Sequence, residues 1–238
     1  MLSKERLSRS FISNKILTSV RHDIVSGKLL PNTVLTEPML AERFNYSRGP
    51  VRTALMVLES EGLIRVLPSG RTLVVGLTPK LIDDLFRFRL NLETLATDLM
   101  TKTPPLNLDG LRTIVRKMQH SRDPAMLREL NVQFHSQLVQ LSDNDFLHKA
   151  WLQLAPIFEA ILAVTDPQLP EDVRIAGTHQ ELVQIISEHR WSALSTALAE
   201  HMERPRRLIT EHVDRLLAKQ TSVPDDSATH RDSETSSV

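Results

Sequence analysis

The sequence has no cysteine and little glycine or aromatic residue. Among 238 residues the absence of cysteine excludes disulfides and thiolate metal sites, so histidine, carboxylate or amide groups must hold any metal. Seven glycines and an aromatic content of 4% disfavour Gly-rich loops and β-sandwich folds. The shortages predict a mainly α-helical protein.

Long apolar runs are also lacking. No stretch of about 18 consecutive apolar residues occurs, and the opening MLSKERLSRSF lacks the apolar segment of a signal peptide. We therefore expect a cytoplasmic protein that has no membrane partner.

The net charge of zero hides two halves of opposite sign. Residues 1–76 carry 11 Lys/Arg against 6 Asp/Glu, a net charge of +5, and the remainder carries −5. The length predicts two domains. We place the boundary at residue 76 and expect the basic part to meet a polyanion, although chance surface variation would give the same split.

The basic part shows amphipathic helices followed by a hairpin. Apolar residues recur at helical spacing, Thr36 and Ser47 are N-cap candidates, and two β-branched runs surround a Pro-Ser-Gly turn. Helices are predicted over 9–26, 37–44 and 48–61, and strands over 63–66 and 72–75. This order is that of a winged helix-turn-helix, in which the second motif helix enters the DNA major groove.

Short polar and basic side chains lie at the start of that second motif helix. Ser47, Arg48, Gly49, Arg52 and Thr53 are predicted to be exposed there. Hydroxyl and guanidinium groups at this place can reach phosphates and base edges. Taken in isolation, the two arginines would be read as solvated surface residues, but their context favours a DNA-binding role.

The rest of the chain predicts an antiparallel all-α bundle with a polar tail. Short connections between long amphipathic helices are typical of bundles, whose interiors can hold a ligand or a metal. The Ser/Thr/Asp-rich tail is expected to be disordered. Helices are predicted from 79 through 95 at least, and over 108–119, 123–141, 144–164, 170–188 and 192–218; the bundle domain spans 77–220 and the tail 221–238.

Three bundle histidines are candidate metal ligands. His135, His179 and His201 lie on three separate predicted helices, and Asn131 precedes the first by one helical turn. Neutral imidazole binds divalent transition ions well, although spacing alone favours histidines that pack and hydrogen-bond in the core. The other bundle histidines are expected at the surface: His120, His148, His189 and His212.

The N-terminal part resembles the DNA-binding domain of the GntR family. The resemblance covers Gly27 to Gly76 and rests on LAERF, SRGPVR, AL, LE and EGL within LAERFNYSRGPVRTALMVLESEGLIRVLPSGRTLVV. It implies operator contacts from Ser47, Arg48 and Arg52. It also implies contacts from the wing tip at Ser69, Gly70 and Arg71. Where many relatives have an arginine early in the first motif helix, this chain has Pro38, so one contact is expected to be missing.

The bundle is similar to the ligand-binding FCD domain of the FadR-type branch of the same family. The stretches that carry this similarity are DLFRFRLNLETLA, NVQFHSQLVQLSDNDFL and THQELVQIISEHRWSALSTALAEHM. The resemblance implies a divalent transition metal, zinc or nickel, held by His135, His179 and His201. It also implies an acidic effector beside the metal.

Two residues qualify this expectation. Asn131 stands where many relatives have an aspartate ligand, and a neutral amide oxygen is a weaker donor than a carboxylate. Arg89 could clamp an effector carboxylate with its planar fork, or instead form a salt bridge with a neighbouring acid.

The leading hypothesis is a homodimeric bacterial regulator that binds a near-palindromic operator and responds to a small anionic metabolite, such as a carboxylic or sugar acid. One alternative is a metal-free regulator whose histidines hydrogen-bond the effector directly. A metal-dependent enzyme is the other rival, but no well-placed general base or nucleophile accompanies the histidines. We therefore expect a protein that is not an enzyme.

Overall fold

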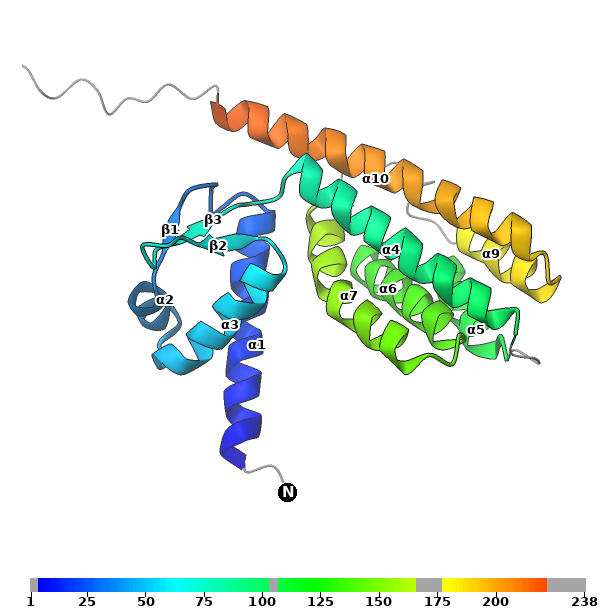
Figure 1. Ribbon diagram of the computed structural model, residues 1–238, viewed down its shortest axis with the longest axis horizontal. Helices are drawn as coiled ribbons and strands as arrows, with labels where there is room; N and C mark the ends of the chain where they lie inside the picture. The colour runs from blue at the N-terminus through cyan, green and yellow to red at the C-terminus, as the bar shows by residue number, and fades with distance from the viewer. Residues whose placement is uncertain (1–3, 103–106, 166–176, 222–238) are drawn as a thin grey trace, which may run out of the picture.

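A computed structural model describes residues 4–102, 107–165 and 177–221 of the chain (Figure 1). The N-terminal unit contains three helices and a small antiparallel sheet of strand order β1-β3-β2. Strands β2 and β3 form the predicted hairpin, and β1 is an addition that sequence periodicity did not indicate because it has only two residues. The elements are α1 (Lys4–Val25), β1 (Val34–Leu35), α2 (Glu37–Phe44), α3 (Arg48–Ser60), β2 (Ile64–Val66) and β3 (Thr72–Val74).

Local signals place the start and end of α2. The hydroxyl of Thr36 accepts a hydrogen bond from the backbone N–H of Met39 at 3.3 Å, which is an N-cap. Pro38 is tolerated because first-turn amides have no intrahelical acceptor. Asn45 then adopts a left-handed conformation, with φ of 56°, and ends the helix. The turn to α3 is therefore fixed by short-range chemistry.

Two ion pairs attach α1 to the motif helices. Arg21 donates to both carboxylate oxygens of Glu61, at 2.9 and 2.6 Å, and both side chains are buried. Asp23, two residues further along α1, pairs with Arg43 of α2. Because α1 also packs Ile16 and Val20 into the core, the unit is held by apolar contacts and by partnered buried charges.

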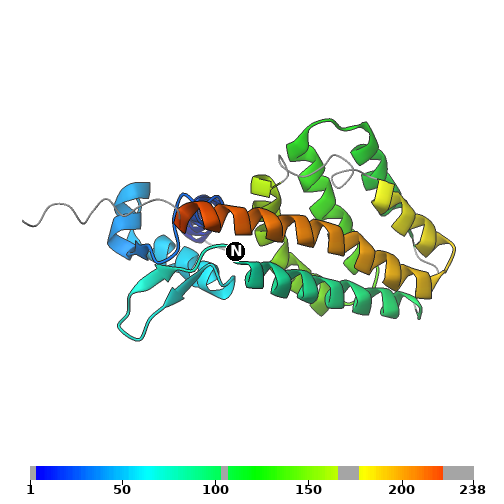
Figure 2. The same ribbon diagram turned by 90° about the horizontal axis from the view of Figure 1, so that it is seen from above.

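The second unit is a helical bundle. Helix α10 runs along α4, and the remaining helices pack beneath this pair (Figures 1 and 2). Large apolar side chains, including Phe134, Trp151 and Phe158, fill its interior. The helices are α4 (Pro79–Met100), α5 (Asp109–His120), α6 (Pro124–Gln140), α7 (Asp145–Thr165), α9 (Gly177–Ser187) and α10 (Trp191–Thr221).

The start of α1 and the burial of His212 differ from the sequence-based expectations, and part of one predicted helix lies outside the described residues. Helix α1 begins at Lys4, five residues before the predicted start. The helix predicted from residue 170 is described from Gly177 onward; residues 170–176 and most of the expected tail lie outside the described residues. His212 is buried rather than exposed, because it lies on the side of α10 that also carries the buried residue Ile209.

Helix α7 is long and apolar enough to cross a membrane by length and composition alone. In this fold it contributes Trp151, Phe158 and Ile161 to the bundle core. Core helices of water-soluble proteins commonly pass the same test.

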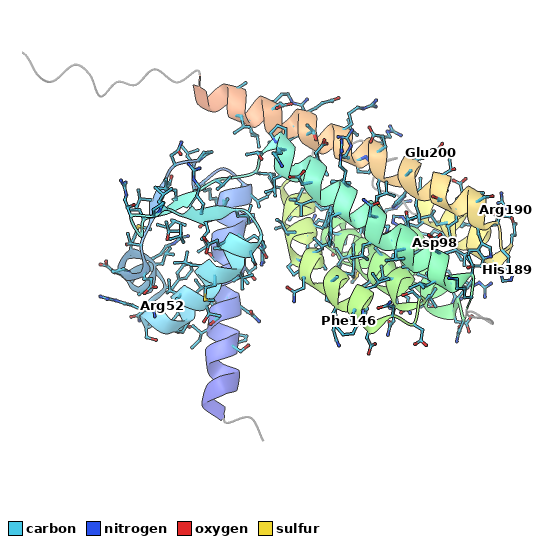
Figure 3. All side chains as sticks on the ribbon, in the orientation of Figure 1. Arg52, Asp98, Phe146, His189, Arg190 and Glu200 are labelled. Atoms are coloured by element: carbon cyan, nitrogen blue, oxygen red, sulfur yellow. The ribbon has the colours of Figure 1, made fainter. Side chains whose placement is uncertain are left out.

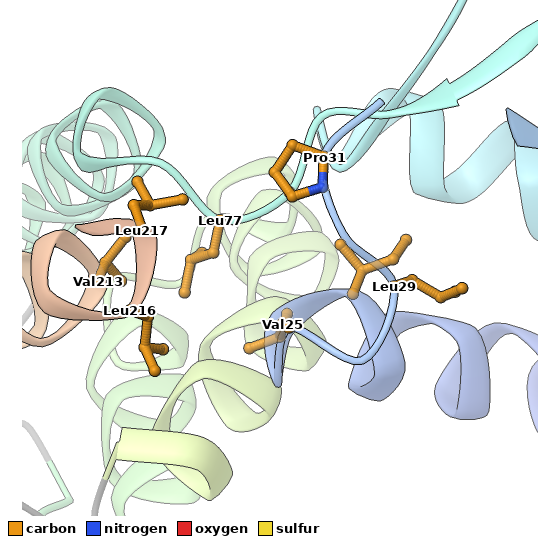
Figure 4. Close-up of a pocket in the computed structure, with 10 residues that line it drawn as sticks. Val25, Leu29, Pro31, Leu77, Val213, Leu216 and Leu217 are labelled. Carbon is orange, nitrogen blue, oxygen red and sulfur yellow. The ribbon is translucent and has the colours of Figure 1, made fainter. Parts of the chain in front are cut away.

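The two units touch at the end of α10. Val213, Leu216 and Leu217 of α10 face Leu77 of the connecting segment and a cluster from the N-terminal unit that includes Val25, Leu29 and Pro31 (Figure 4). The space left between them is only about 20 Å³. We call this contact the inter-unit seam.

Candidate DNA interface and metal centre

The predicted DNA-contact residues gather at the start of α3. Ser47, Arg48, Gly49, Arg52 and Thr53 are all exposed, and Arg52 lies on the side of the N-terminal unit that faces away from the bundle (Figure 3). A Cβ added at Gly49 would meet no atom within 4 Å, so the surface above it is open. The side chain of Thr53 donates to the Gly49 carbonyl at 3.3 Å. The structure thus brings these five residues to one accessible helix end.

Ser47 occupies the N-cap position of α3 but does not act through its side chain. Its backbone is extended, as the position requires, yet its hydroxyl makes no capping hydrogen bond. A cap hydroxyl accepts from the second or third helical N–H, and Pro50 at the third position has none. The predicted N-cap position of Ser47 is confirmed, and its hydroxyl, which makes no capping hydrogen bond, stays exposed at the candidate DNA face.

Arg52 forms a two-pronged ion pair with Glu37, the first residue of α2. The Nε atom donates to one carboxylate oxygen at 2.7 Å and Nη2 donates to the other at 2.9 Å. This hydrogen bond lowers the pKa of Glu37, so its carboxylate is ionised at neutral pH. Sequence reasoning missed Glu37 because nothing in its local pattern indicates a partner fifteen residues away.

The wing tip lies beside this pair. Gly70 has a positive φ of 79°, and the turn closes with hydrogen bonds from Gly70 N–H to the Leu67 carbonyl at 2.8 Å and from Leu67 N–H to the Arg71 carbonyl at 2.9 Å. Ser69, Gly70 and Arg71 are exposed and, with Arg52, line a groove of about 480 Å³ between α3 and the wing. Pro38 lines the groove too.

In the bundle the three predicted histidines converge. One nitrogen from each of His135 (α6), His179 (α9) and His201 (α10) lies within 4.8 Å of the others, and Nε2 of His135 is 3.2 Å from Nε2 of His201. The Oδ1 atom of Asn131 is 3.0 Å from Nε2 of His179. Side chains far apart in sequence therefore form one cluster, as the resemblance implied.

A buried ion pair orients this cluster. The Nδ1 atom of His135 lies 2.8 Å from Oε2 of Glu93, and Arg89 donates from Nε to Oε1 of the same carboxylate at 2.9 Å. With Nδ1 protonated, the Nε2 lone pair of His135 is turned toward His201. Carboxylates orient metal-bound histidines in the same manner. Arg89 thus forms a salt bridge with a neighbouring acid, which was one of its two roles considered from sequence. The other guanidinium donors of Arg89 do not bond to Glu93.

Burial controls the protonation of these groups. It holds the pKa values of His135 and His201 well below the usual range, so both imidazoles are neutral at physiological pH. Burial also raises the pKa of Glu93 to about 7, against the opposing effect of the Arg89 charge. Neutral imidazole is the form that can bind a metal ion.

The donor set fits a divalent transition ion. Metal–nitrogen bonds of about 2.0–2.1 Å place two ligands of one ion about 3.0–3.4 Å apart, which the His135–His201 separation matches. Asn131 would supply an amide oxygen in place of the common carboxylate. The candidate donors are three neutral imidazole nitrogens and one neutral amide oxygen, with no carboxylate among them. Such a set suits zinc or nickel better than calcium or magnesium.

Three neighbours of the cluster were not singled out as site residues from sequence. Glu93 orients His135, and the Thr178 hydroxyl lies 3.1 Å from Nδ1 of His201. Trp151 is buried, its ring centroid is 5.9 Å from that of His135, and its Nε1 donor has no hydrogen-bond partner among the described residues. A tryptophan in an apolar stripe reads as core, which explains why sequence alone did not find it.

Comparison with protein families supports the assignment of both the N-terminal unit and the helical bundle. Residues 12–74 match the model for bacterial regulatory proteins of the gntR family, and residues 84–204 match the FCD domain, which covers half of the chain. The chain belongs to the GntR family. This GntR-family regulator therefore combines a DNA-binding helix-turn-helix with an FCD domain, and its mainly helical fold class is confirmed.

Its relatives are transcriptional regulators rather than enzymes. The chain is 31% identical over 188 residues to the gluconate operon transcriptional repressor of Bacillus subtilis, covering 77% of this chain and 74% of that protein. It is 24% identical over 214 residues to a probable D-xylose utilization operon transcriptional repressor of Paenarthrobacter nicotinovorans, covering 89% of both. The solved structure of Escherichia coli McbR/YncC shares the fold, with a TM-score of 0.63, 22% identity and coverage of 85% and 98%.

Proposed function

We propose that this GntR-family regulator is a cytoplasmic repressor whose operator binding responds to a small anionic metabolite. In this proposal residues 1–76 bind DNA and residues 77–220 bind the effector and dimerise, as in the FadR-type branch. The observation that carries the proposal is the exposed start of α3, where Arg48 and Arg52 lie beside the basic wing tip in a fold of this family. No membrane partner and no catalytic role are assigned.

Ser47, Arg48, Gly49, Arg52 and Thr53 are proposed to enter the major groove. The wing tip, at Ser69, Gly70 and Arg71, is proposed to lie along the adjacent backbone. Their exposure and common groove support this assignment. Guanidinium groups give base selectivity where they meet guanine edges and general affinity where they meet phosphates.

The test is an operator titration with Arg48→Ala and Arg52→Ala. Each substitution is expected to weaken operator binding by about 5- to 150-fold while leaving the circular dichroism spectrum unchanged. The matched control is Arg112→Ala, which removes an exposed arginine from α5 of the bundle. Unchanged operator affinity in both α3 variants would refute their assigned roles.

The effector site is proposed at the histidine cluster. Asn131, His135, His179 and His201 would hold a divalent ion, zinc or nickel, which would supply direct coordination for an oxygen anion. Arg89 would orient the same acid with the guanidinium donors that Glu93 does not use. Because two relatives are named for a gluconate operon, and gluconate is a sugar acid, gluconate is the first probe to try.

A metal-free regulator is the alternative, since Asn131 weakens the ligand set. In that form the neutral histidines and Arg89 would hydrogen-bond the acid directly. Elemental analysis of protein purified without a chelating tag separates the two. About one zinc or nickel per chain supports the metal-bound form, and gluconate binding without metal supports the alternative.

A homodimer is proposed because apolar side chains remain exposed on two packed bundle helices. Phe88 and Leu95 of α4 are 53% and 48% exposed, and Phe146 and Leu152 of α7 are 82% and 52% exposed. Exposed large apolar groups in clusters commonly mark interfaces. A two-fold dimer would present two recognition helices to a near-palindromic operator.

Helix α10 is proposed to connect effector site and DNA-binding unit. It carries His201 of the cluster and, twelve residues later, Val213 of the inter-unit seam. The two residues are about 18 Å apart along α10, which continues as one helix through Pro205. A ligand that prefers one position of His201 would therefore shift the seam, and a coupling of about 1–3 kcal/mol would change operator affinity about 5- to 150-fold.

A further inference from the structure

The ion pair between Glu37 and Arg52 uses only one side of the guanidinium. Glu37 takes Nε–H and one N–H of Nη2. A guanidinium has five N–H donors, so both N–H groups of Nη1 and the second of Nη2 remain, and the Nη1/Nη2 edge next to the carboxylate is free. That edge, with Nη1 and Nη2 side by side, has the spacing that matches the O6 and N7 acceptors of guanine.

The backbone that carries Glu37 is fixed by its two neighbours at the start of α2. Glu37 lies between the capping residue Thr36 and Pro38, whose ring fixes its own φ. Its side chain is 28% exposed, against 66% for Arg52. Glu37 therefore forms the more buried half of the pair, and Arg52 extends toward solvent on the outer side of the unit (Figure 3).

A carboxylate at a DNA-binding surface has an electrostatic cost. Glu37 lines the same groove as the wing tip, where a phosphate backbone would carry dense negative charge. As a simple surface ion pair it would add little to stability. The position of Glu37 is better explained if it restricts Arg52 to one orientation. An unrestricted arginine would lose more side-chain conformational entropy when it binds DNA.

We propose that Glu37 is a positioning residue for base reading: it fixes the Arg52 guanidinium so that its free edge contacts one guanine in each operator half-site. This inference rests on the proposed DNA face. It adds that selectivity at one base pair depends on a residue of α2 that does not touch the base. It also implies that Glu37 raises selectivity while lowering sequence-independent affinity.

The test compares Glu37→Gln with Glu42→Gln, which removes an equal charge from an exposed position of the same helix. Binding is measured at one salt concentration to the operator, to operators with each half-site base pair replaced, and to unrelated DNA. Glu37→Gln is expected to lower the preference for guanine at one position by about 3- to 30-fold, part of what a bidentate contact supplies. Its affinity for unrelated DNA is expected to rise, because a negative charge has left the groove. Glu42→Gln keeps the wild-type preference.

A double-mutant cycle gives a second readout. It does not depend on how large a change in base preference each single substitution causes. Once Arg52→Ala has removed the guanidinium, adding Glu37→Gln should leave base preference unchanged. Full wild-type selectivity in Glu37→Gln would overturn the inference and leave the proposed function standing. Wild-type protein that shows no selective DNA binding would overturn the proposed function, and the inference with it.

Discussion

At the scale of single residues, Asn131 distinguishes the candidate metal site, because it offers a neutral amide oxygen beside three imidazoles. Its amide oxygen lies 3.0 Å from Nε2 of His179, at the edge of the three-histidine cluster. The position of this group was predicted from sequence, because helical spacing places it one turn before His135. Its partner could not be predicted, since 48 residues separate the two side chains.

Replacing this amide with a carboxylate should strengthen metal binding. Asn131→Asp adds a negative donor to three neutral nitrogens and is expected to raise zinc affinity by about 10-fold or more. Competition with a chromophoric chelator measures the change, and Asn131→Ala is the matched loss of the donor. Equal zinc affinity in all three proteins would place residue 131 outside the metal site.

The Glu37–Arg52 pair predicts how base selectivity depends on pH. Hydrogen bonding to Arg52 lowers the pKa of Glu37 below the usual range of a glutamate, so the folded carboxylate stays ionised well into the acidic range. A group with a depressed pKa loses its contribution only as the pH falls through the lowered value. The ratio of operator affinities for guanine and its replacement should therefore be constant from about pH 5.5 to 8. A ratio that falls steadily below pH 7 would contradict this assignment.

At the scale of elements, helix and strand positions followed from local signals. The Thr36 cap, Asn45 turn and Gly70 hairpin fixed α2, α3 and the wing to within a few residues. Local signals did not predict features that depend on contacts between residues far apart in the sequence. Strand β1 is only two residues long and exists because it pairs with β3, and His212 is buried because of how α10 packs. Neither effect is visible in sequence periodicity.

The buried pair of Arg21 and Glu61 should hold α1 against α3. Removing one partner leaves an uncompensated buried charge, so Arg21→Ala is expected to destabilise the N-terminal unit by about 3–5 kcal/mol. Replacing both residues with apolar ones, as in Arg21→Met with Glu61→Leu, should cost less than the single change. Chemical denaturation followed by circular dichroism measures both. A single variant as stable as wild type would show that the pair is dispensable.

The inter-unit seam should transmit binding between the two halves of the chain. Leu216→Ala opens the small apolar contact between α10 and the N-terminal unit without touching the histidines. Because coupling is reciprocal, operator DNA should change zinc affinity in wild type, and this change should shrink in Leu216→Ala. The control is Arg215→Ala at a neighbouring exposed position. An undiminished change would place the coupling elsewhere.

At the scale of the whole molecule, the sequence predicted a basic DNA-binding half and an acidic helical half. It could not predict how the halves meet, because the seam joins residues 25–31 to residues 213–217. The oligomeric state likewise depends on surface shape rather than on periodicity. Exposed Phe88 and Leu95 on α4 now supply a concrete expectation.

Charges on that face should separate the dimer. Phe88→Glu with Leu95→Glu places two carboxylates at exposed apolar positions, so the bundle should fold normally while the protein becomes monomeric. Sedimentation equilibrium reports the mass. The matched control is Lys80→Glu, which makes the charge of α4 more negative by the same two units at an exposed position and leaves the apolar residues in place. Two copies per particle in the Phe88/Leu95 variant would assign the interface to another surface.

The central claim is that this chain is a dimeric, sequence-selective DNA-binding regulator. It is tested most directly by selection of genomic fragments with the full-length protein, followed by titration of the enriched site at fixed salt. The account predicts one short near-palindrome, bound by two chains at least 1,000-fold more tightly than unrelated DNA. Enrichment of no common sequence, with weak binding that salt abolishes equally on every fragment, would contradict it.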